Sequence, residues 1–230
     1  MNLKHWFSTS SIFCLLLFGC ENNQKPTTFP KADSVAISSE NLPISSLPKQ
    51  QKAKPSKPDK PIRVLLTGDS MIGCLFFPLK KFDAEKRYKF IYSPWYGSTS
   101  KDWGKSDSLK SLIAKYKPDY VFFTVGANEL LYYSLKKREA YYDSIKVQLA
   151  NIKYVFIGAP NWKPAEEYYQ ILKDKIPEGQ LFMSKDFPLA RRKDKAHPTF
   201  EAGFIWTDSL CNWLETKSKY QSDFYFKAPR

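Results

Sequence analysis

Short apolar runs, each followed by a glycine, a proline or a polar residue, recur along the chain from residue 62 onward. They cover residues 62–67, 88–92, 120–125, 154–157 and 181–183. In the longer runs the apolar residues are consecutive and do not alternate with polar ones, which is the pattern of strands buried on both faces. The sequence therefore predicts five strands of a mostly parallel sheet.

Segments with apolar residues at helical spacing separate these runs. They cover residues 107–117, a stretch within 133–149, and residues 165–173 and 200–215. The first of them has Leu109, Leu112 and Ile113 on one face and is followed by Pro118, which ends a helix. Strands that alternate with helices imply βαβ units. We therefore expect one α/β domain, residues 62–230, built as a three-layer α/β/α sandwich around the five-stranded sheet.

The residues before this domain have a different composition. Residues 1–19 have a positive charge at Lys4 and then an apolar run that is shorter than the ~20 residues needed to span a bilayer. The run ends in Leu-Phe-Gly-Cys, which resembles a bacterial lipobox, so we expect a lipoprotein signal peptide and a lipid on Cys20. A plain secretory signal is the alternative. Residues 20–61 are rich in Pro, Ser and Lys and are predicted to form a disordered tether.

Export has consequences for the partners and for the cysteines. The protein is expected in the cell envelope, anchored to a membrane through its lipid. Its net charge of +13 favours anionic surroundings, but no aromatic-interleaved basic motif is present, so no nucleic-acid partner is predicted. Cys74 and Cys211 are left either to form a disulfide or to remain as two buried thiols. No Cys/His cluster has metal-ligand spacing, so no metal site is predicted, and the oligomeric state stays open.

His197 is the only histidine outside the predicted signal peptide. Imidazole is the side chain best suited to proton transfer near neutral pH. Asp194 precedes it by three residues, at a spacing that lets a carboxylate accept a hydrogen bond from the ring. Taken alone, a histidine before a proline is more often an ordinary loop residue.

Three polar or glycine-containing turns follow predicted strands and add to this pair. They are Gly68-Asp69-Ser70, the region of Gly97, and Gly126-Ala127-Asn128-Glu129. Because the carboxyl ends of parallel strands share one edge of a sheet, Ser70, Gly97 and Asn128 are expected on the same rim. The Ser70 backbone N–H and the Asn128 amide can stabilise an oxyanion there, whereas Asp69 is expected to fix the turn. Ordinary turns are the alternative for each segment.

Together these segments resemble the conserved blocks of the SGNH (GDSL-type) hydrolase family. The matching blocks are Thr67-Gly68-Asp69-Ser70-Met71, Tyr96-Gly97-Ser98, Val125-Gly126-Ala127-Asn128-Glu129 and Asp194-Lys195-Ala196-His197-Pro198. The resemblance runs from Ile62 to about Glu215. Met71 and Glu129 depart from the commoner Leu and Asp, and Gly104 competes with Gly97 for the glycine block.

The resemblance implies a flavodoxin-like fold and a serine esterase without metal or cofactor. Ser70 would be the nucleophile, His197 its base and Asp194 the carboxylate that orients His197. The oxyanion hole would comprise the Ser70 and Gly97 backbone N–H groups and the Asn128 amide. The expected substrate is a small-molecule or glycan O-acyl ester, with acetyl favoured. An acyltransferase using the same triad and a non-catalytic glycan-binding lipoprotein are the alternatives.

Aromatic side chains are frequent close to the predicted strand ends. They are Phe76, Phe77, Trp95, Tyr96, Trp103 and Trp162. Where exposed, they can stack on sugar rings or line an acyl slot, but most are expected to belong to the core. The arginine pair Arg191-Arg192 can attract an anionic substrate, although a solvated surface is the commoner role for such a pair. Residues 217–230 contain four large aromatic residues and can pack back on the domain.

Overall fold

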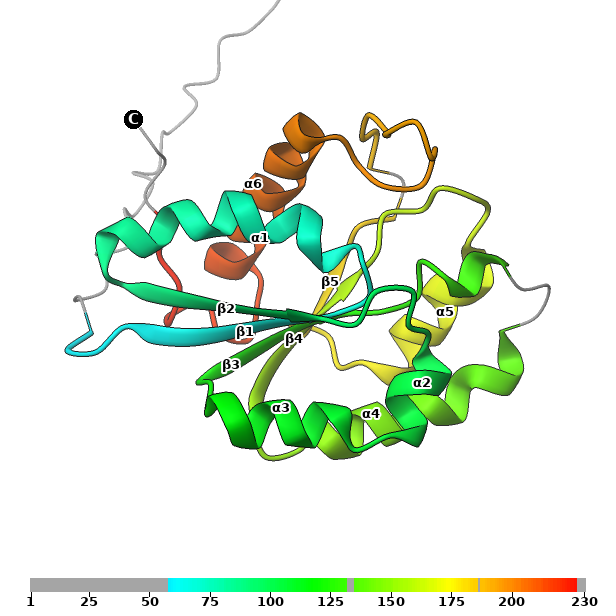
Figure 1. Ribbon diagram of the computed structural model, residues 1–230, viewed down its shortest axis with the longest axis horizontal. Coiled ribbons are helices and arrows are strands. Elements are labelled where there is room, and N and C mark those ends of the chain that lie inside the picture. The colour runs from blue at the N-terminus through cyan, green and yellow to red at the C-terminus, as the bar shows by residue number, and fades with distance from the viewer. Residues whose placement is uncertain (1–57, 132–134, 186, 227–230) are drawn as a thin grey trace, which may run out of the picture. The chain divides into compact units, whose positions relative to one another are not determined.

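A computed structural model describes residues 58–131, 135–185 and 187–226 of the 230-residue chain. Five strands form one sheet in the order β2-β1-β3-β4-β5, and all four pairings are parallel (Figure 1). The strands are β1 (Ile62–Gly68), β2 (Tyr88–Pro94), β3 (Tyr120–Thr124), β4 (Lys153–Gly158) and β5 (Leu181–Met183). This order is the flavodoxin-like one. The predicted strands and the predicted fold class are thus confirmed.

Helices cover both faces of the sheet. They are α1 (Ile72–Lys80), α2 (Ser100–Lys105), α3 (Ser108–Tyr116), α4 (Glu139–Leu149), α5 (Glu166–Lys175) and α6 (Phe200–Thr216). Short 3-10 turns occur at η1 (Lys81–Glu85), η2 (Glu129–Leu131) and η3 (Lys136–Arg138). Figure 1 shows α1 and α6 on one face and α2 to α5 on the other. Each predicted helix is present, and the six-residue α2 is an addition.

The core consists of two clusters, one on each side of the sheet. Alternate residues of a strand point to opposite faces. Accordingly, Val64 and Leu66 of β1 pack with α1 and α6, whereas Leu65 packs with α3, α4 and α5. Both clusters are fully buried at their centres, which explains why the strand sequences are apolar without alternation.

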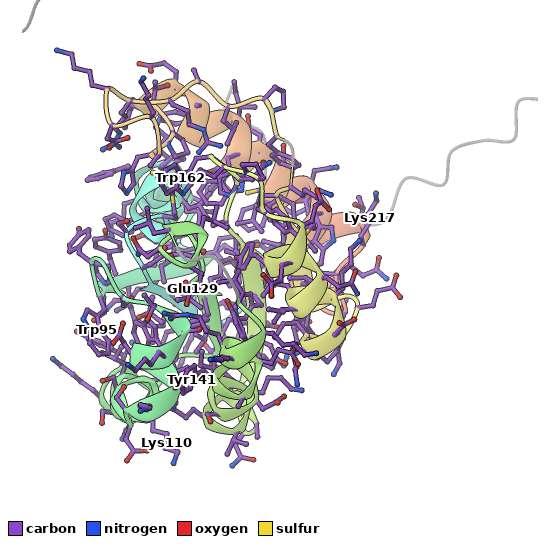
Figure 2. The ribbon with its side chains drawn as sticks, turned by 90° about the vertical axis from the view of Figure 1, so that its right-hand side faces the viewer. Trp95, Lys110, Glu129, Tyr141, Trp162 and Lys217 are labelled. Atoms are coloured by element: carbon purple, nitrogen blue, oxygen red, sulfur yellow. The ribbon has the colours of Figure 1, made fainter. Side chains whose placement is uncertain are left out.

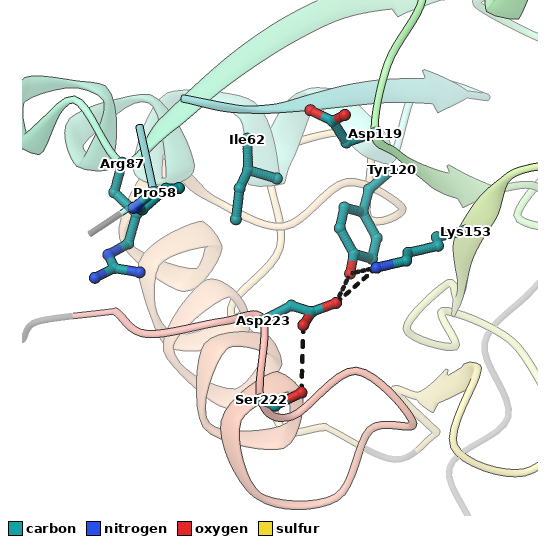
Figure 3. Close-up of a pocket in the computed structure, with 8 residues that line it drawn as sticks. All are labelled: Pro58, Ile62, Arg87, Asp119, Tyr120, Lys153, Ser222 and Asp223. Carbon is teal, nitrogen blue, oxygen red and sulfur yellow. Dashed lines mark hydrogen bonds and ion pairs between the residues drawn. The ribbon is translucent and has the colours of Figure 1, made fainter. Parts of the chain in front are cut away.

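The chain after α6 packs back on the sheet. The rings of Phe224 and Phe226 lie 6.0 and 4.9 Å from that of Tyr88, and all three side chains are buried. Asp223 accepts hydrogen bonds from Tyr120 and from Lys153, the latter at 2.9 Å (Figure 3). The pocket drawn in Figure 3 has a volume of about 400 Å³ and lies where β1, β3 and β4 begin. It is therefore at the opposite end of the strands from Ser70.

The predicted signal peptide (1–19), Cys20 and nearly all of the predicted tether (20–61) lie outside the described residues. None of the helices within the described ranges is long and apolar enough to cross a bilayer. Cys74 and Cys211 are both buried free thiols, so of the two alternatives for this pair the disulfide is wrong.

Candidate active site

Ser70 occupies the turn between β1 and α1. Gly68, at the end of β1, has φ of +131°, and a Cβ there would lie 1.8 Å from the carbonyl oxygen of Thr124 on β3. Only glycine lets the two strands approach this closely where the Ser70 loop leaves the sheet. β1 has β2 on one side and β3 on the other, so the carboxyl end of β1 is the topological switch point of the sheet, where ligands bind in such folds. Ser70 lies at this point.

Asp69 ties this loop to the loop that follows β3. Its carboxylate accepts hydrogen bonds from the backbone N–H groups of Met71 at 3.0 Å, Gly126 at 3.1 Å and Ala127 at 3.2 Å. The side chain is fully buried, and this burial raises the pKa of Asp69 to about 7 against the opposing effect of the three N–H donors. As expected from the sequence, Asp69 fixes the turn.

His197 lies on the loop that enters α6, and its ring reaches Ser70. The distance between His197 Nε2 and Ser70 Oγ is 2.7 Å, and that between His197 Nδ1 and Asp194 Oδ2 is 2.9 Å. Asp194 Oδ1 accepts the backbone N–H groups of His197 and Ala196, each at 2.9 Å. These contacts, the His197 N–H foremost, lower the pKa of Asp194 to about 2. An ionised carboxylate only accepts, so Nδ1 carries the proton and Nε2 is free to accept from Ser70.

Arg191 holds this loop in place. Its guanidinium donates to the carbonyl oxygen of Ala196 and to that of Asn161 on the β4–α5 loop, both at 2.7 Å. The Arg192 backbone N–H donates to the His197 carbonyl at 2.8 Å. All three acceptors are uncharged backbone carbonyls. The sequence suggested a charged surface for this arginine pair, and nothing in it signalled that Arg191 would bond to backbone carbonyls of two loops.

Asn128 and Gly97 lie on the two loops beside Ser70. One N–H of the Asn128 amide donates to the carbonyl oxygen of Ser98 at 2.9 Å, which leaves the second available. The hydrogen bonds of the described residues leave the backbone N–H groups of Ser70 and Gly97 without an acceptor. Gly97, at φ of +73°, is in an exposed turn, whereas Gly104 lies within α2 against Tyr141 of α4. Of the two candidates, Gly97 is the one on the rim.

Glu129 is fully buried behind these loops (Figure 2). Its Oε1 accepts the backbone N–H of Ser100, at the start of α2, and lies 3.6 Å from Arg138 Nη1. The Asn128–Ser98 and Glu129–Ser100 contacts therefore join the same two loops side by side. Burial raises the pKa of Glu129. The sequence marked Glu129 only as a departure from a commoner Asp.

Exposed aromatic side chains border the site. Phe77, Trp95, Tyr96 and Phe200 all expose more than a third of their surface, whereas Trp103 is buried in the core. Trp162 donates from its indole to the Ala127 carbonyl at 3.1 Å. Figure 2 shows Trp95 and Trp162 apart from each other on this end of the domain, with Glu129 deeper between them.

No cluster of three or more His, Cys, Asp or Glu side chains in the described ranges is arranged to hold a metal ion. The residues do form a hydrogen-bonded chain of a hydroxyl, an imidazole and a carboxylate. The loops beside it carry the backbone N–H groups of Ser70 and Gly97, which have no protein acceptor among the described residues, and the Asn128 amide, which has one N–H to spare. Such an arrangement is capable of nucleophilic attack on an acyl carbon.

Comparisons with known proteins give the fold. No family model and no curated protein matches the sequence. Among solved structures, a catalytic mutant of Axe2, an acetylxylan esterase from Geobacillus stearothermophilus, has a TM-score of 0.52 at 14% identity and covers 68% of this chain and 95% of its own. The acetyl xylan esterase AlAXEase has a TM-score of 0.51 at 16% identity and covers 66% and 98%. The chain shares its fold with these esterases.

Proposed function

We propose that this protein is a carboxylic ester hydrolase of the SGNH type, with Ser70 as the nucleophile, His197 as the base and Asp194 as the orienting carboxylate. The observation that carries the proposal is the chain of contacts from Ser70 Oγ to His197 Nε2 at 2.7 Å and from His197 Nδ1 to Asp194 at 2.9 Å. Ser70 and His197, which meet in it, are 127 positions apart in the sequence. The fold shared with acetylxylan esterases supports the same reading.

In the first half-reaction Ser70 Oγ attacks the acyl carbon while its proton passes to His197 Nε2. Asp194 stays ionised and stabilises the imidazolium that forms. The negative charge that develops on the carbonyl oxygen is met by the backbone N–H groups of Ser70 and Gly97 and by the free N–H of Asn128. His197 then gives its proton to the leaving alcohol, and the acyl group remains on Ser70.

In the second half-reaction His197 takes a proton from water, and the resulting hydroxide attacks the acyl-Ser70 carbonyl. The same three N–H groups receive the charge again. When the tetrahedral intermediate collapses, His197 returns the proton to Ser70 Oγ and the carboxylic acid leaves. Besides the ester and water, every group in these steps belongs to the chain.

The proposed substrate is a short O-acyl ester, acetyl first, on a carbohydrate. Two of the proteins that share the fold are named for acetyl esters of xylan. Residues 1–19 with Cys20 support export and lipid anchoring, which would place the enzyme among envelope glycans. Replacing Cys20 by Ser should release the protein from the membrane fraction and abolish incorporation of a labelled fatty acid. Unchanged incorporation would contradict the anchor.

The test of the activity uses full-length protein in detergent with p-nitrophenyl acetate, butyrate and octanoate. We expect the acetate to be hydrolysed fastest, and Ser70→Ala and His197→Ala each to lose about 10³-fold or more in kcat. Near-wild-type hydrolysis by Ser70→Ala would remove the proposal. Circular dichroism of both variants establishes that they are folded.

A further inference from the structure

We propose that a groove beside the catalytic rim binds the sugar chain whose ester is cleaved. The groove has a volume of about 500 Å³ and runs from the end of β2 to the first turns of α3. Trp95 provides its exposed aromatic surface against the buried Trp103, Pro94 and Leu112 also line it, and Ser93, Asp107, Ser108 and Ser111 provide its polar groups. This inference rests on the proposed esterase function and names the part of the substrate that the catalytic residues do not touch.

Trp95 is a supported aromatic surface. It exposes 40% of its area, and its ring centre lies 5.3 Å from that of Trp103 in an edge-to-face contact. Trp103 is buried, donates from its indole to Ser98 Oγ at 2.7 Å and packs on Phe123 of the sheet. Because Trp103 is fixed, Trp95 has a firm base while part of its ring stays in water. An aromatic side chain that is already held loses little conformational freedom when a ligand stacks on it.

Half of the residues that line the groove are polar. Asp107, Ser108 and Ser111 come from the start of α3, and Ser93 comes from the outer strand β2, beside which no further strand pairs in the described sheet. Within the described residues, the hydroxyl groups of Ser93, Ser108 and Ser111 make no hydrogen bond to the protein. Hydroxyl and carboxylate groups beside a tryptophan suit a ligand with many hydroxyls and apolar C–H faces.

The composition of the groove decides between ligand classes. The lining is mixed, since Pro94, Leu112 and the two tryptophans are apolar, but three serines and an aspartate would be costly to bury against an acyl chain. An anionic ligand would face the Asp107 carboxylate, whose partner is Lys110 at 3.1 Å. A neutral saccharide fits both observations. The geometry thus favours sugar over acyl chain in this groove.

The groove also begins next to the nucleophile. The Trp95 backbone N–H donates to the carbonyl oxygen of Gly68 at 2.8 Å, two residues before Ser70. Trp95 likewise lies two residues before Gly97, so the tryptophan and the oxyanion loop form one segment. Figure 2 shows Trp95 and Lys110, which belongs to α3, in the same lower-left part of the view. A sugar with its ester at Ser70 can therefore extend over Trp95 toward α3.

The kinetic test compares acetylated xylo-oligosaccharides with p-nitrophenyl acetate, which is too small to occupy the groove while it reacts at Ser70. For Trp95→Ala we expect KM on the oligosaccharide to rise roughly 3- to 10-fold, the range for loss of one aromatic contact. Its kcat/KM on p-nitrophenyl acetate should stay within about twofold. Ile205→Ala, which removes another exposed apolar side chain, from α6, should change neither value.

A binding measurement separates failure of the groove from failure of the enzyme. Unacetylated xylotetraose is titrated into full-length Ser70→Ala protein and into the Ser70→Ala/Trp95→Ala double variant, with calorimetry as readout. We expect saturable binding by the first and at least a threefold weaker affinity in the second. Equal affinities, or an unchanged oligosaccharide KM in Trp95→Ala, overturn the groove. An enzyme inactive on every ester that still binds xylotetraose through Trp95 overturns the esterase alone.

Discussion

Replacing Asn128 by Ala tests the oxyanion hole more selectively than replacing any triad residue. The Asn128 amide has two N–H bonds, of which one donates to the Ser98 carbonyl at 2.9 Å and the other is assigned to the developing oxyanion. Alanine removes both while leaving Ser70, His197 and Asp194 in contact. The variant should therefore bind and attack the ester but stabilise the transition state poorly.

The two losses differ in size. An oxyanion-hole donor is worth about 10²–10³ in kcat. The hydrogen bond to Ser98 is worth about 1 kcal/mol of stability, out of the ~5–15 kcal/mol that keeps an ordinary domain folded. Asn128→Ala should therefore remain almost wholly folded at 25 °C. A hundredfold fall in kcat then cannot arise from unfolded protein.

The assay is steady-state hydrolysis of p-nitrophenyl acetate, together with urea unfolding of the same preparations. We expect kcat to fall by about 10²–10³ with KM nearly unchanged, since the donor acts on the transition state. Asn151→Ala, at an exposed position after α4, is the matched control and should match the wild type. A folded Asn128→Ala protein with less than a tenfold loss of kcat would refute the assignment.

Three further predictions follow from backbone geometry and from the carboxyl groups. The melting temperature of Gly126→Ala should be well below that of Gly97→Ala. A Cβ at position 126 would lie 2.0 Å from the Tyr168 ring, whereas one at position 97 has nothing within 4 Å. Similar melting temperatures for the two variants would be evidence against this packing. Because backbone N–H groups of its own loop hold the pKa of Asp194 near 2, this carboxylate should stay ionised from pH 4 upward; an Asp194 carboxyl resonance that titrates above pH 4 in carbon-13 NMR would contradict this. The buried carboxyl of Asp69, with its pKa raised to about 7, binds a proton more tightly in the folded state, so the free energy of unfolding should decrease from about pH 5 to about pH 7; urea unfolding that shows an increase over this range would be inconsistent with it.

Much of the fold was predictable because its strongest signals are local. The run from Ile62 to Gly68 is buried on both faces, so nearly every residue is apolar and the strand is visible in the sequence. Gly68, which ends β1, and Gly126, two residues after β3, mark the loops with Ser70 and Asn128 in the sequence. Helix α2 was not predicted, since six residues with a glycine among them give no periodic pattern.

The arrangement of the site was only partly predictable, because it depends on contacts between distant segments. The sequence singled out His197 with Asp194, and Ser70 on the rim, but the roles of base, orienting carboxylate and nucleophile came from the family resemblance and not from any local pattern. The hydrogen bonds from Arg191 to the Ala196 and Asn161 carbonyls form only when two loops pack together. Hydrogen bonds from a side chain to distant backbone leave no periodicity or spacing in a sequence.

The most direct test of the account is covalent labelling of the nucleophile. Full-length protein is incubated with diethyl p-nitrophenyl phosphate, which phosphorylates activated serines, and its peptides are then analysed by mass spectrometry. If Ser70 is the nucleophile and His197 its base, we expect one diethylphosphoryl adduct, on Ser70. Ser70→Ala should give no adduct, and labelling of His197→Ala should be much slower. An adduct on a different residue, or equal labelling of Ser70→Ala, would contradict this assignment.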